Sequence, residues 1–207
     1  MTAEMGKTLG LILAGGASKR FGTNKALADL GGRPIVAHVA ARAALQVDRL
    51  VLNAADDAAA TGLTVVPDLT PGEGPLGGWL SGLTWAKEHG FPLVATFACD
   101  TPQFPADIVA RLEAAIGDGA DCAMARHNDQ VHHTFALVRT ACLDRLEEAY
   151  GAGMRRLRAV GSVLRCALPD FSDCHDGPGG DAFFNINTQD DLDLFRVWMQ
   201  DHGRDLQ

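Results

Sequence analysis

The segment Leu9–Lys25 reads Leu-Gly-Leu-Ile-Leu-Ala-Gly-Gly-Ala-Ser-Lys-Arg-Phe-Gly-Thr-Asn-Lys. It begins with an apolar run, Leu9–Ala14, and a short apolar run bounded by glycines predicts a buried strand. Gly15 and Gly16 follow, and paired glycines let the backbone turn sharply and let a ligand approach the main chain. Three cations come soon after, namely Lys19, Arg20 and Lys25. A strand that ends in a glycine turn rich in cations predicts a phosphate-binding site.

The glycine turn matches neither of the two common phosphate-binding fingerprints. A Walker loop has Lys and then Ser or Thr directly after its second glycine, whereas Gly22 is followed by Thr23 and Asn24. A dinucleotide fingerprint reads G-x-G-x-x-G, and residues 15–20 lack it. Taken by itself, the segment therefore leaves open a plain strand–turn–helix unit with surface cations.

Charge and composition narrow the class of ligand and the compartment. The 207 residues carry a net charge of −8, which argues against nucleic acid as a partner. Residues 1–50, by contrast, hold seven Lys or Arg and three Asp or Glu, and a cationic segment on an acidic body suits a small anionic ligand. No apolar run approaches the roughly 20 residues of a membrane span, and residues 1–8 are too short and polar for a signal peptide. Five cysteines without a C-x-x-C pair favour a reducing compartment, so we expect a cytoplasmic protein without membrane contact.

Apolar runs and helical patterns alternate along the first half of the chain. After the first strand, the expected elements are strands at residues 49–53, 63–66 and 93–98 and helices at 34–43, 76–88 and 105–117. Strands that alternate with helices predict a parallel sheet with crossover connections. We therefore expect a single α/β domain over residues 1–207, with three-layer, Rossmann-like architecture: a mostly parallel sheet with helices on both faces.

The second half of the chain departs from this alternation. Residues 120–125 and 134–138 predict two strands, and the short connection at 127–133 indicates that they pair in an antiparallel manner. The remaining expected elements are helices at 140–150 and 154–160, a loop at 170–181, a short strand at 183–187 and a final helix capped by Thr188.

Four predicted strands end in glycine or polar residues: Gly15–Gly16, Asn53, Asp68 and Asp100. In an open α/β sheet, ligands bind beyond the carboxyl ends of the strands. Asp100 directly follows a buried strand, where it can hold Mg²⁺ that bridges phosphate oxygens and offsets charge on a leaving pyrophosphate. The alternative for Asp100 is a cap of the next helix, and Asp68 is equally compatible with an ordinary turn before Pro71.

Cations and amides complete the candidate site. Arg20 and Lys25 are candidates to neutralise a triphosphate, because nucleotidyl transfer depends on in-line positioning and charge stabilisation; a lone cation can equally be a surface residue. Asn185 and Asn187 alternate along a predicted strand, so their side chains share one face and can bind a polar ring or a phosphate. His132–His133 is expected in a loop, as surface or lining residues without a shared metal.

In their order along the chain, these motifs resemble those of the molybdenum cofactor nucleotidyltransferase family, which has a glycosyltransferase-A-like fold. The match is closest to its guanylyltransferase branch. The segments that carry the resemblance are Leu13–Gly16, Lys25, Val51–Ala54, Val65–Asp68 with Gly74–Gly78, Ala98–Pro102 and Phe184–Thr188.

The resemblance implies a Mg²⁺-dependent nucleotidyltransferase fold and activity. A terminal phosphate of molybdopterin, or of Mo-molybdopterin, attacks the α-phosphate of GTP, GMP is transferred and pyrophosphate leaves. It implies a nucleotide-binding part at about 1–117 and a pterin-facing part at about 118–207, in a cytoplasmic monomer that contacts cofactor-supplying or cofactor-receiving proteins transiently. The residues it assigns are Leu13, Ala14, Gly15, Gly16, Lys25, Asn53, Asp68, Gly77 and Asp100 to GTP binding, Arg20, Lys25 and Asp100 to catalysis, Asp100 to the metal, and Asn185 and Asn187 to the pterin substrate.

Two features depart from the family pattern, and both fall on the pterin-facing part. His133 stands where members tend to have proline, and Cys174–Gly180 resembles an insertion. The alternatives are a cytidylyltransferase or sugar-phosphate nucleotidyltransferase of the same fold, a nucleotide-binding regulatory module without catalysis, and an α/β domain that binds no nucleotide. Cytidylyltransferase relatives typically have L-A-A-G in the first loop and serines in the later segment, so Gly15 and Gly77–Gly78 favour GTP over CTP.

Overall fold

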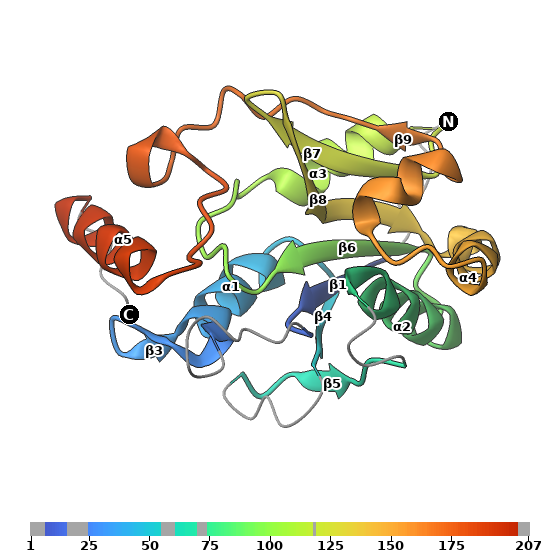
Figure 1. Cartoon of the computed structure of the whole chain (residues 1–207), viewed down its shortest axis with the longest axis horizontal. Coiled ribbons are helices and arrows are strands. Elements are labelled where there is room, and N and C mark those ends of the chain that lie inside the picture. The colour runs from blue at the N-terminus through green and yellow to red at the C-terminus, as the bar shows by residue number, and fades with distance from the viewer. Residues whose placement is uncertain (1–6, 16–24, 55–60, 70–73, 118, 203–207) are drawn as a thin grey trace.

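The computed structural model of the chain describes residues 7–15, 25–54, 61–69, 74–117 and 119–202. Its centre is a seven-stranded sheet in the order β5-β4-β1-β6-β8-β7-β9 (Figure 1). The strands are β1 (Thr8–Leu13), β4 (Arg49–Asn53), β5 (Thr64–Val66), β6 (Leu93–Ala98), β7 (Cys122–His127), β8 (Gln130–Arg139) and β9 (Cys166–Ala167). A separate two-stranded hairpin joins β2 (Asp29–Leu30) to β3 (Arg33–Pro34).

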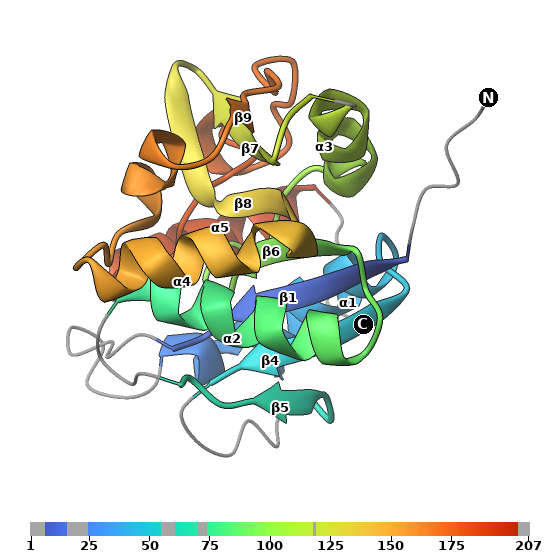
Figure 2. The same ribbon diagram turned by 90° about the vertical axis from the view of Figure 1, so that its right-hand side faces the viewer.

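Helices cover both faces of the sheet, which makes three layers. The cluster on one face combines α1 (Ile35–Ala44) and α3 (Ile108–Ile116) with side chains of β1, β4, β6 and β8. The other face packs against α2 (Pro75–Glu88) and α4 (Leu143–Gly151), which lie side by side across the strands (Figure 2). The predicted α/β class and three-layer architecture are therefore confirmed.

The direction of the strands also follows the prediction. β1 pairs in parallel with β4 and with β6, and β4 pairs in parallel with β5. β8 runs antiparallel to both of its neighbours, β6 and β7, as expected for the second half of the chain. Buried parallel strands are nearly continuous apolar runs, which is why β4 and β6 begin and end at the residues that the sequence predicts.

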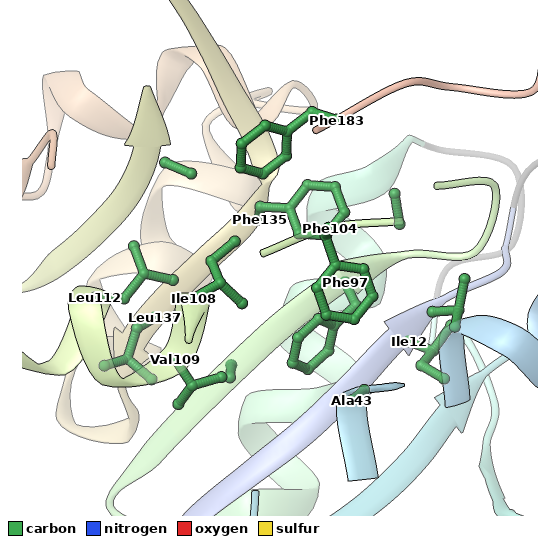
Figure 3. Close-up of a cluster of buried hydrophobic side chains, with 14 of the residues drawn as sticks. Ile12, Ala43, Phe97, Phe104, Ile108, Val109, Leu112, Phe135, Leu137 and Phe183 are labelled. Carbon is green, nitrogen blue, oxygen red and sulfur yellow. The ribbon is translucent and has the colours of Figure 1, made fainter. Parts of the chain in front are cut away.

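One aromatic cluster connects the two halves of the chain (Figure 3). Phe97 of β6 lies 5.2 Å from Phe104, and Phe104 lies 5.4 Å from Phe135 of β8, measured between ring centroids. Phe183, from the C-terminal segment, meets Phe135 edge-on at 5.2 Å. All four rings are buried. Because each buried ring contributes a large apolar area, the C-terminal segment is part of the same core as the parallel sheet.

The C-terminal helix forms a smaller core of its own. α5 (Gln189–Asp201) packs Phe195 and Trp198 against Leu30 and Ile35 at the β2–β3 hairpin. Thr188 caps this helix as predicted: its side chain accepts a hydrogen bond from Asp191 N, and Asp191 accepts one from Thr188 N. The helix thus brings the end of the chain back to the segment that follows the glycine turn.

Some predicted element boundaries differ from the structure. Pro34 precedes α1 as its N-cap and belongs to the β2–β3 hairpin, whereas the sequence predicts it inside the helix. The helix expected from Pro105 begins at Ile108. The helix expected at 154–160 is a 3₁₀ helix, η3 (Leu157–Ser162). Short 3₁₀ turns also occur at η1 (Lys25–Leu27), η2 (Thr140–Cys142) and η4 (Pro178–Gly180).

The prediction of a strand at 183–187 is wrong. Phe183 N donates to Asp181 Oδ1 at 2.8 Å, and Phe184 N donates to Asp181 O, so this backbone forms a turn. Ile186 N donates to Asp100 O at 2.9 Å, which joins the segment to the end of β6 through a single backbone contact. Side-chain capture of backbone amides competes with sheet formation, and no ladder forms here.

His132 and His133 lie within strand β8, so the loop predicted for them is also wrong. The turn between β7 and β8 is confined to Asn128 and Asp129, which both have positive φ angles, 46° and 64°. A two-residue hairpin turn needs this backbone conformation, and Asn and Asp tolerate it better than most residues. The two strands therefore extend further than their apolar residues indicate.

Within the described ranges, no helix is long and apolar enough to cross a membrane.

Close packing of α2 on β1 yields a prediction about stability. A Cβ atom added to Gly82 would lie 2.3 Å from Leu11 Cδ2, and Leu11 is fully buried. We expect Gly82→Ala to lower the free energy of unfolding by about 1–3 kcal/mol, as overpacking in a filled core does. Chemical denaturation with the fluorescence of the buried Trp79 measures this.

Gly161→Ala is the matched control, because nothing lies within 4 Å of the added Cβ in η3. That variant should be neutral or slightly stabilising, since alanine lowers the entropy of the unfolded chain. Equal free energies of unfolding for the two variants would contradict close packing at Gly82.

Candidate active site at the carboxyl edge of the sheet

The parallel register brings the predicted strand ends to one edge. Leu13 pairs with Asn53 and with Ala98, and Asn53 pairs with Val66. The chain segments that leave β1, β4, β5 and β6 therefore start side by side. This is the edge at which open α/β sheets bind ligands.

Asn53 is the centre of the nucleotide side of this edge. Its buried side chain donates from Nδ2 to Val66 O at 3.2 Å, and its backbone oxygen accepts from Ala14 N at 2.8 Å. A Cβ atom added to Gly15 would lie 3.2 Å from Asn53 Oδ1, and one added to Gly78 would lie 2.5 Å from it. The two glycines thus leave room for the Asn53 side chain. Asn53 joins the end of β5 through its side-chain amide and the residue after β1 through its backbone oxygen.

The other predicted nucleotide residues lie around Asn53. Asp68 Oδ2 lies 3.7 Å from the Cβ position of Gly15. Leu13 and Ala14 pack toward opposite faces of the sheet, Leu13 on the α2 side and Ala14 on the α1 side. Gly77 is buried in the first turn of α2 and accepts a hydrogen bond from Ser81 Oγ at 3.0 Å. Gly16 and Arg20 lie outside the described residues.

Lys25 and Asp100 form an ion pair at the centre of the edge. Lys25 Nζ lies 2.8 Å from Asp100 Oδ2, and the side chains are only 9% and 25% exposed. Lys25 Nζ also donates to Asn187 Oδ1 at 2.8 Å. The structure therefore brings together residues 25, 100 and 187, which the sequence predicts separately as phosphate, metal and pterin ligands.

Thr101 joins the second predicted asparagine to the same cluster. Its fully buried hydroxyl donates to Asn185 Oδ1 and lies 3.3 Å from Asp100 Oδ1. Together with the contact of Ile186 N with Asp100 O, this fastens the C-terminal segment to the end of β6, beside which it runs in Figure 1. The sequence analysis does not select Thr101 as a site residue, although its position directly after Asp100 is the available signal.

Several oxygen atoms at this edge are of the kinds that bind a hard divalent cation. Asp100, Thr101 and the two asparagines offer carboxylate, hydroxyl and amide oxygens, the ligand types that Mg²⁺ takes. In the part of the chain that the structure describes, no group of three or more His, Cys, Asp or Glu gathers to hold a metal.

Cys99, next to Asp100, does not supply a nucleophile. Burial and the neighbouring Asp100 charge raise the pKa of its thiol to about 12. The reactive form of cysteine is the thiolate, so Cys99 stays protonated and unreactive at neutral pH.

A bulge in β8 places the two histidines near the same edge. The β7 register steps from Met124↔Ala136 to Ala125↔His132, so residues 133–135 form extra length in β8. His132 stacks on Phe183 at 4.3 Å, and burial lowers its pKa to about 4, so it is neutral at pH 7. His133 Nδ1 lies on the other side, 3.4 Å from Met124 Sδ. Bulges commonly re-aim side chains beside active sites.

A cationic segment at the start of α2 is a further feature that the sequence analysis misses. Arg155 O accepts a hydrogen bond from Leu76 N, and a Cβ atom added to Gly74 would lie 2.9 Å from the same oxygen. Arg156 and Arg158 are exposed beside this contact. The pattern Arg-Arg-Leu-Arg is the sequence signal for this cationic segment, in which Arg155 also donates to Tyr150 O and Met154 O.

Comparison with known proteins identifies the family of the chain. A family model described as "MobA-like NTP transferase domain" matches residues 10–166. A molybdenum cofactor guanylyltransferase of Rhizobium meliloti is 40% identical over 197 residues, covering 91% of this chain and 90% of the relative. One from Cereibacter sphaeroides is 39% identical over 190 residues, covering 90% of this chain and 94% of the relative.

A solved structure is also similar in fold. The molybdopterin-guanine dinucleotide biosynthesis protein A of Archaeoglobus fulgidus superposes with a TM-score of 0.73 at 22% identity, covering 93% of this chain and 99% of the other. At that identity the likeness concerns the fold alone. The family match and the relatives near 40% identity carry the assignment, and the chain therefore belongs to the MobA-like NTP transferase family.

Proposed function

We propose that the chain transfers GMP from GTP to the terminal phosphate of molybdopterin or Mo-molybdopterin. An oxygen of that phosphate attacks the α-phosphorus of GTP, a new P–O–P linkage forms, the bond to the β-phosphate breaks, and pyrophosphate leaves with the bonding electrons. The observation that carries the proposal is the Lys25 ammonium, which contacts Asp100 in the nucleotide part and Asn187 in the pterin-facing part. The names of relatives about 40% identical over most of the chain support the same reaction.

Each predicted residue has a role in this proposal. Lys25 and Arg20 bind the triphosphate, because fixed cations stabilise charge that develops on the departing phosphates. Asn185 and Asn187 contact the pterin substrate. Three segments bind the nucleotide: Leu13, Ala14, Gly15 and Gly16 at the end of β1, Asp68 after β5, and Gly77 in the first turn of α2. Asn53 already commits one amide hydrogen to Val66 O, so we assign it the role of holding the backbone at Gly15 beside the base.

We further propose Mg²⁺ as the metal, with Asp100 as its protein ligand. When bound, the ion supplies positive charge that offsets the charge of the leaving pyrophosphate. Five free thiols in the described chain suit a reducing compartment, which supports a cytoplasmic location for the enzyme.

The role of Asp100 predicts a specific loss of activity. We expect Asp100→Asn to lower kcat/KM for guanylate transfer roughly 100–1,000-fold, the range found when one group that stabilises transition-state charge is removed. Pyrophosphate release with GTP and molybdopterin measures the rate, and circular dichroism checks the fold.

Asp144→Asn is the matched control, because Asp144 pairs with Lys87 on an exposed surface. A folded Asp100→Asn enzyme that works at near wild-type rate would exclude Asp100 from the reaction.

The Lys25–Asp100 pair predicts an effect on metal affinity that does not depend on turnover. Lys25 lies against the carboxylate that we assign to the metal, and like charges at that distance repel strongly. We expect Lys25→Met to bind Mn²⁺ about tenfold more tightly than wild type without nucleotide, which is ~1.4 kcal/mol. Electron paramagnetic resonance of free Mn²⁺ measures the affinity.

Lys87→Met removes a lysine from an exposed ion pair with Asp144 and serves as the control. It should leave Mn²⁺ affinity unchanged. The double variant Lys25→Met/Asp100→Asn should lack the tighter Mn²⁺ binding expected of Lys25→Met. Equal Mn²⁺ affinity in wild type and Lys25→Met would show that Lys25 does not compete for Asp100.

The identity of the base decides between the guanylyltransferase and the cytidylyltransferase. We expect kcat/KM to be higher for GTP than for CTP by about tenfold or more, because the wrong base leaves buried polar groups without partners. We expect Gly15, whose Cβ position lies 3.2 Å from Asn53 Oδ1, to leave room for the larger purine and to let main-chain groups reach its edge. Transfer from the two nucleotides is measured under identical conditions, and a higher value for CTP would refute the guanylyltransferase while leaving the nucleotidyltransferase intact.

A further inference from the structure

Asp191, in the first turn of α5, contacts a residue of the candidate site and has so far been described only as part of the helix cap. Asp191 Oδ2 accepts hydrogen bonds from Asn187 N and from Thr188 N, each at 2.8 Å. The contact with Thr188 belongs to the capping box of the helix. The contact with Asn187 goes beyond the box, because it holds the backbone of a residue whose side chain lies in the site.

A short chain of contacts leads from Asp191 to the catalytic edge. Asp191 holds the Asn187 backbone, Asn187 Oδ1 accepts from Lys25 Nζ at 2.8 Å, and Lys25 Nζ lies 2.8 Å from Asp100 Oδ2. Each contact is within ordinary hydrogen-bond length. Asn187 itself is exposed, so its place depends on these contacts: Asp191 holds its backbone N–H, and Lys25 Nζ contacts its side-chain oxygen.

The two ends of this chain rest on the same small core. α5 packs against Leu30 and Ile35 through Phe195 and its neighbours, and Arg196 Nη2 donates to Asp29 O at 2.6 Å. Lys25 lies in η1, only a few residues before the β2–β3 hairpin that contains Asp29 and Leu30. The position of Asp191 relative to Lys25 is therefore held by packing, and the Asn187 amide spans the remaining gap.

The charge of Asp191 suits this position. Burial raises its pKa, but hydrogen bonds from Asn187 and Thr188 and the nearby Lys25 charge outweigh burial and hold the pKa below its ordinary value. A carboxylate with a depressed pKa stays ionised at neutral pH. It therefore adds negative potential near Lys25 as well as a fixed acceptor for the Asn187 backbone.

We propose that Asp191 is a positioning residue, which holds Asn187 so that its side-chain oxygen keeps the Lys25 ammonium directed at the triphosphate site. The proposal rests on the proposed guanylyltransferase function for the role of Lys25. It assigns to the α5 capping box a second task beside helix stability: coupling the pterin-facing part of the chain to the phosphate-binding lysine.

The test compares two alanine variants that break the same cap. Thr188→Ala removes the side-chain acceptor of Asp191 N. Asp191→Ala keeps that backbone amide but removes the carboxylate that accepts from Thr188 N and from Asn187 N. Both should lower the Tm, as loss of an N-cap does. We expect Asp191→Ala to raise the Kd for Mg²⁺·GTP about tenfold beyond Thr188→Ala, the lower range for loss of a supporting partner at a polar site. Calorimetric titration measures the Kd.

Two further measurements separate positioning from stability. In a Lys25→Met background, Asp191→Ala should cause no additional loss of GTP affinity, because the residue acts through Lys25. Competitive acetylation read by mass spectrometry should label Lys25 several-fold faster in Asp191→Ala than in wild type, relative to Lys87. Asp190→Ala removes a charge from the same helical turn and should match wild type in all three assays.

The outcomes distinguish this inference from the function on which it rests. Three results would each overturn the positioning role. The first is an equal Kd for Thr188→Ala and Asp191→Ala, and the second is unchanged acetylation of Lys25. The third is that Asp191→Ala lowers GTP affinity as much in the Lys25→Met background as in wild type. If Asp191→Ala does not fold, Asp191→Asn keeps one acceptor oxygen and should give an intermediate rise in Kd and in labelling; wild-type values would overturn the inference. Failure of the wild-type protein to bind Mg²⁺·GTP would instead refute the proposed function, and the acetylation result would still decide the role of Asp191.

Discussion

The ion pair between Lys25 and Asp100 is the interaction on which the rest of the site depends. A lysine with a side chain only 9% exposed has lost most of its hydration, and that loss is tolerated only where charge and hydrogen bonds replace the water. Asp100 supplies the charge and Asn187 a second acceptor. Removing either partner from such a cation leaves it undercompensated, so η1, the end of β6 and the C-terminal segment are held in one arrangement.

The C-terminal segment, which we assign to the pterin substrate, is joined to the rest of the fold by apolar and by polar contacts. The core reaches it through Phe183, which packs on Phe135, and the polar edge reaches it through Thr101 and Asn187. Apolar contact is non-directional, so it fixes that the two parts touch. Hydrogen bonds with defined donors and acceptors fix which residues face each other, and at this edge they align the residues assigned to two different substrates.

The sequence predicts well those strands and helices that the local pattern of apolar residues encodes. Continuous apolar runs mark buried parallel strands, so β4 and β6 are predicted to the residue. The strand prediction for 183–187 is wrong because the Asp181 side chain accepts a hydrogen bond from Phe183 N. Alternation of polar and apolar residues does not reveal such a side-chain to backbone contact. The prediction of a loop at His132 and His133 is wrong because apolar residues alone mark the two strands too short. The turn lies at Asn128 and Asp129, whose positive φ angles suit a two-residue hairpin.

The candidate site was predictable in its residue types and not in its contacts. Lys25 and Asp100 are 75 positions apart and Lys25 and Asn187 are 162 apart, and no local pattern states that such residues meet. The chemistry nevertheless constrains the outcome. A site for a triphosphate and a divalent cation needs a fixed ammonium and a fixed carboxylate, and two such groups on one sheet edge attract each other. Pairing between a predicted phosphate ligand and a predicted metal ligand is therefore an expected consequence of building both into one site. The contact of Lys25 with Asn187, a residue predicted for the other substrate, is the part that only the fold could reveal.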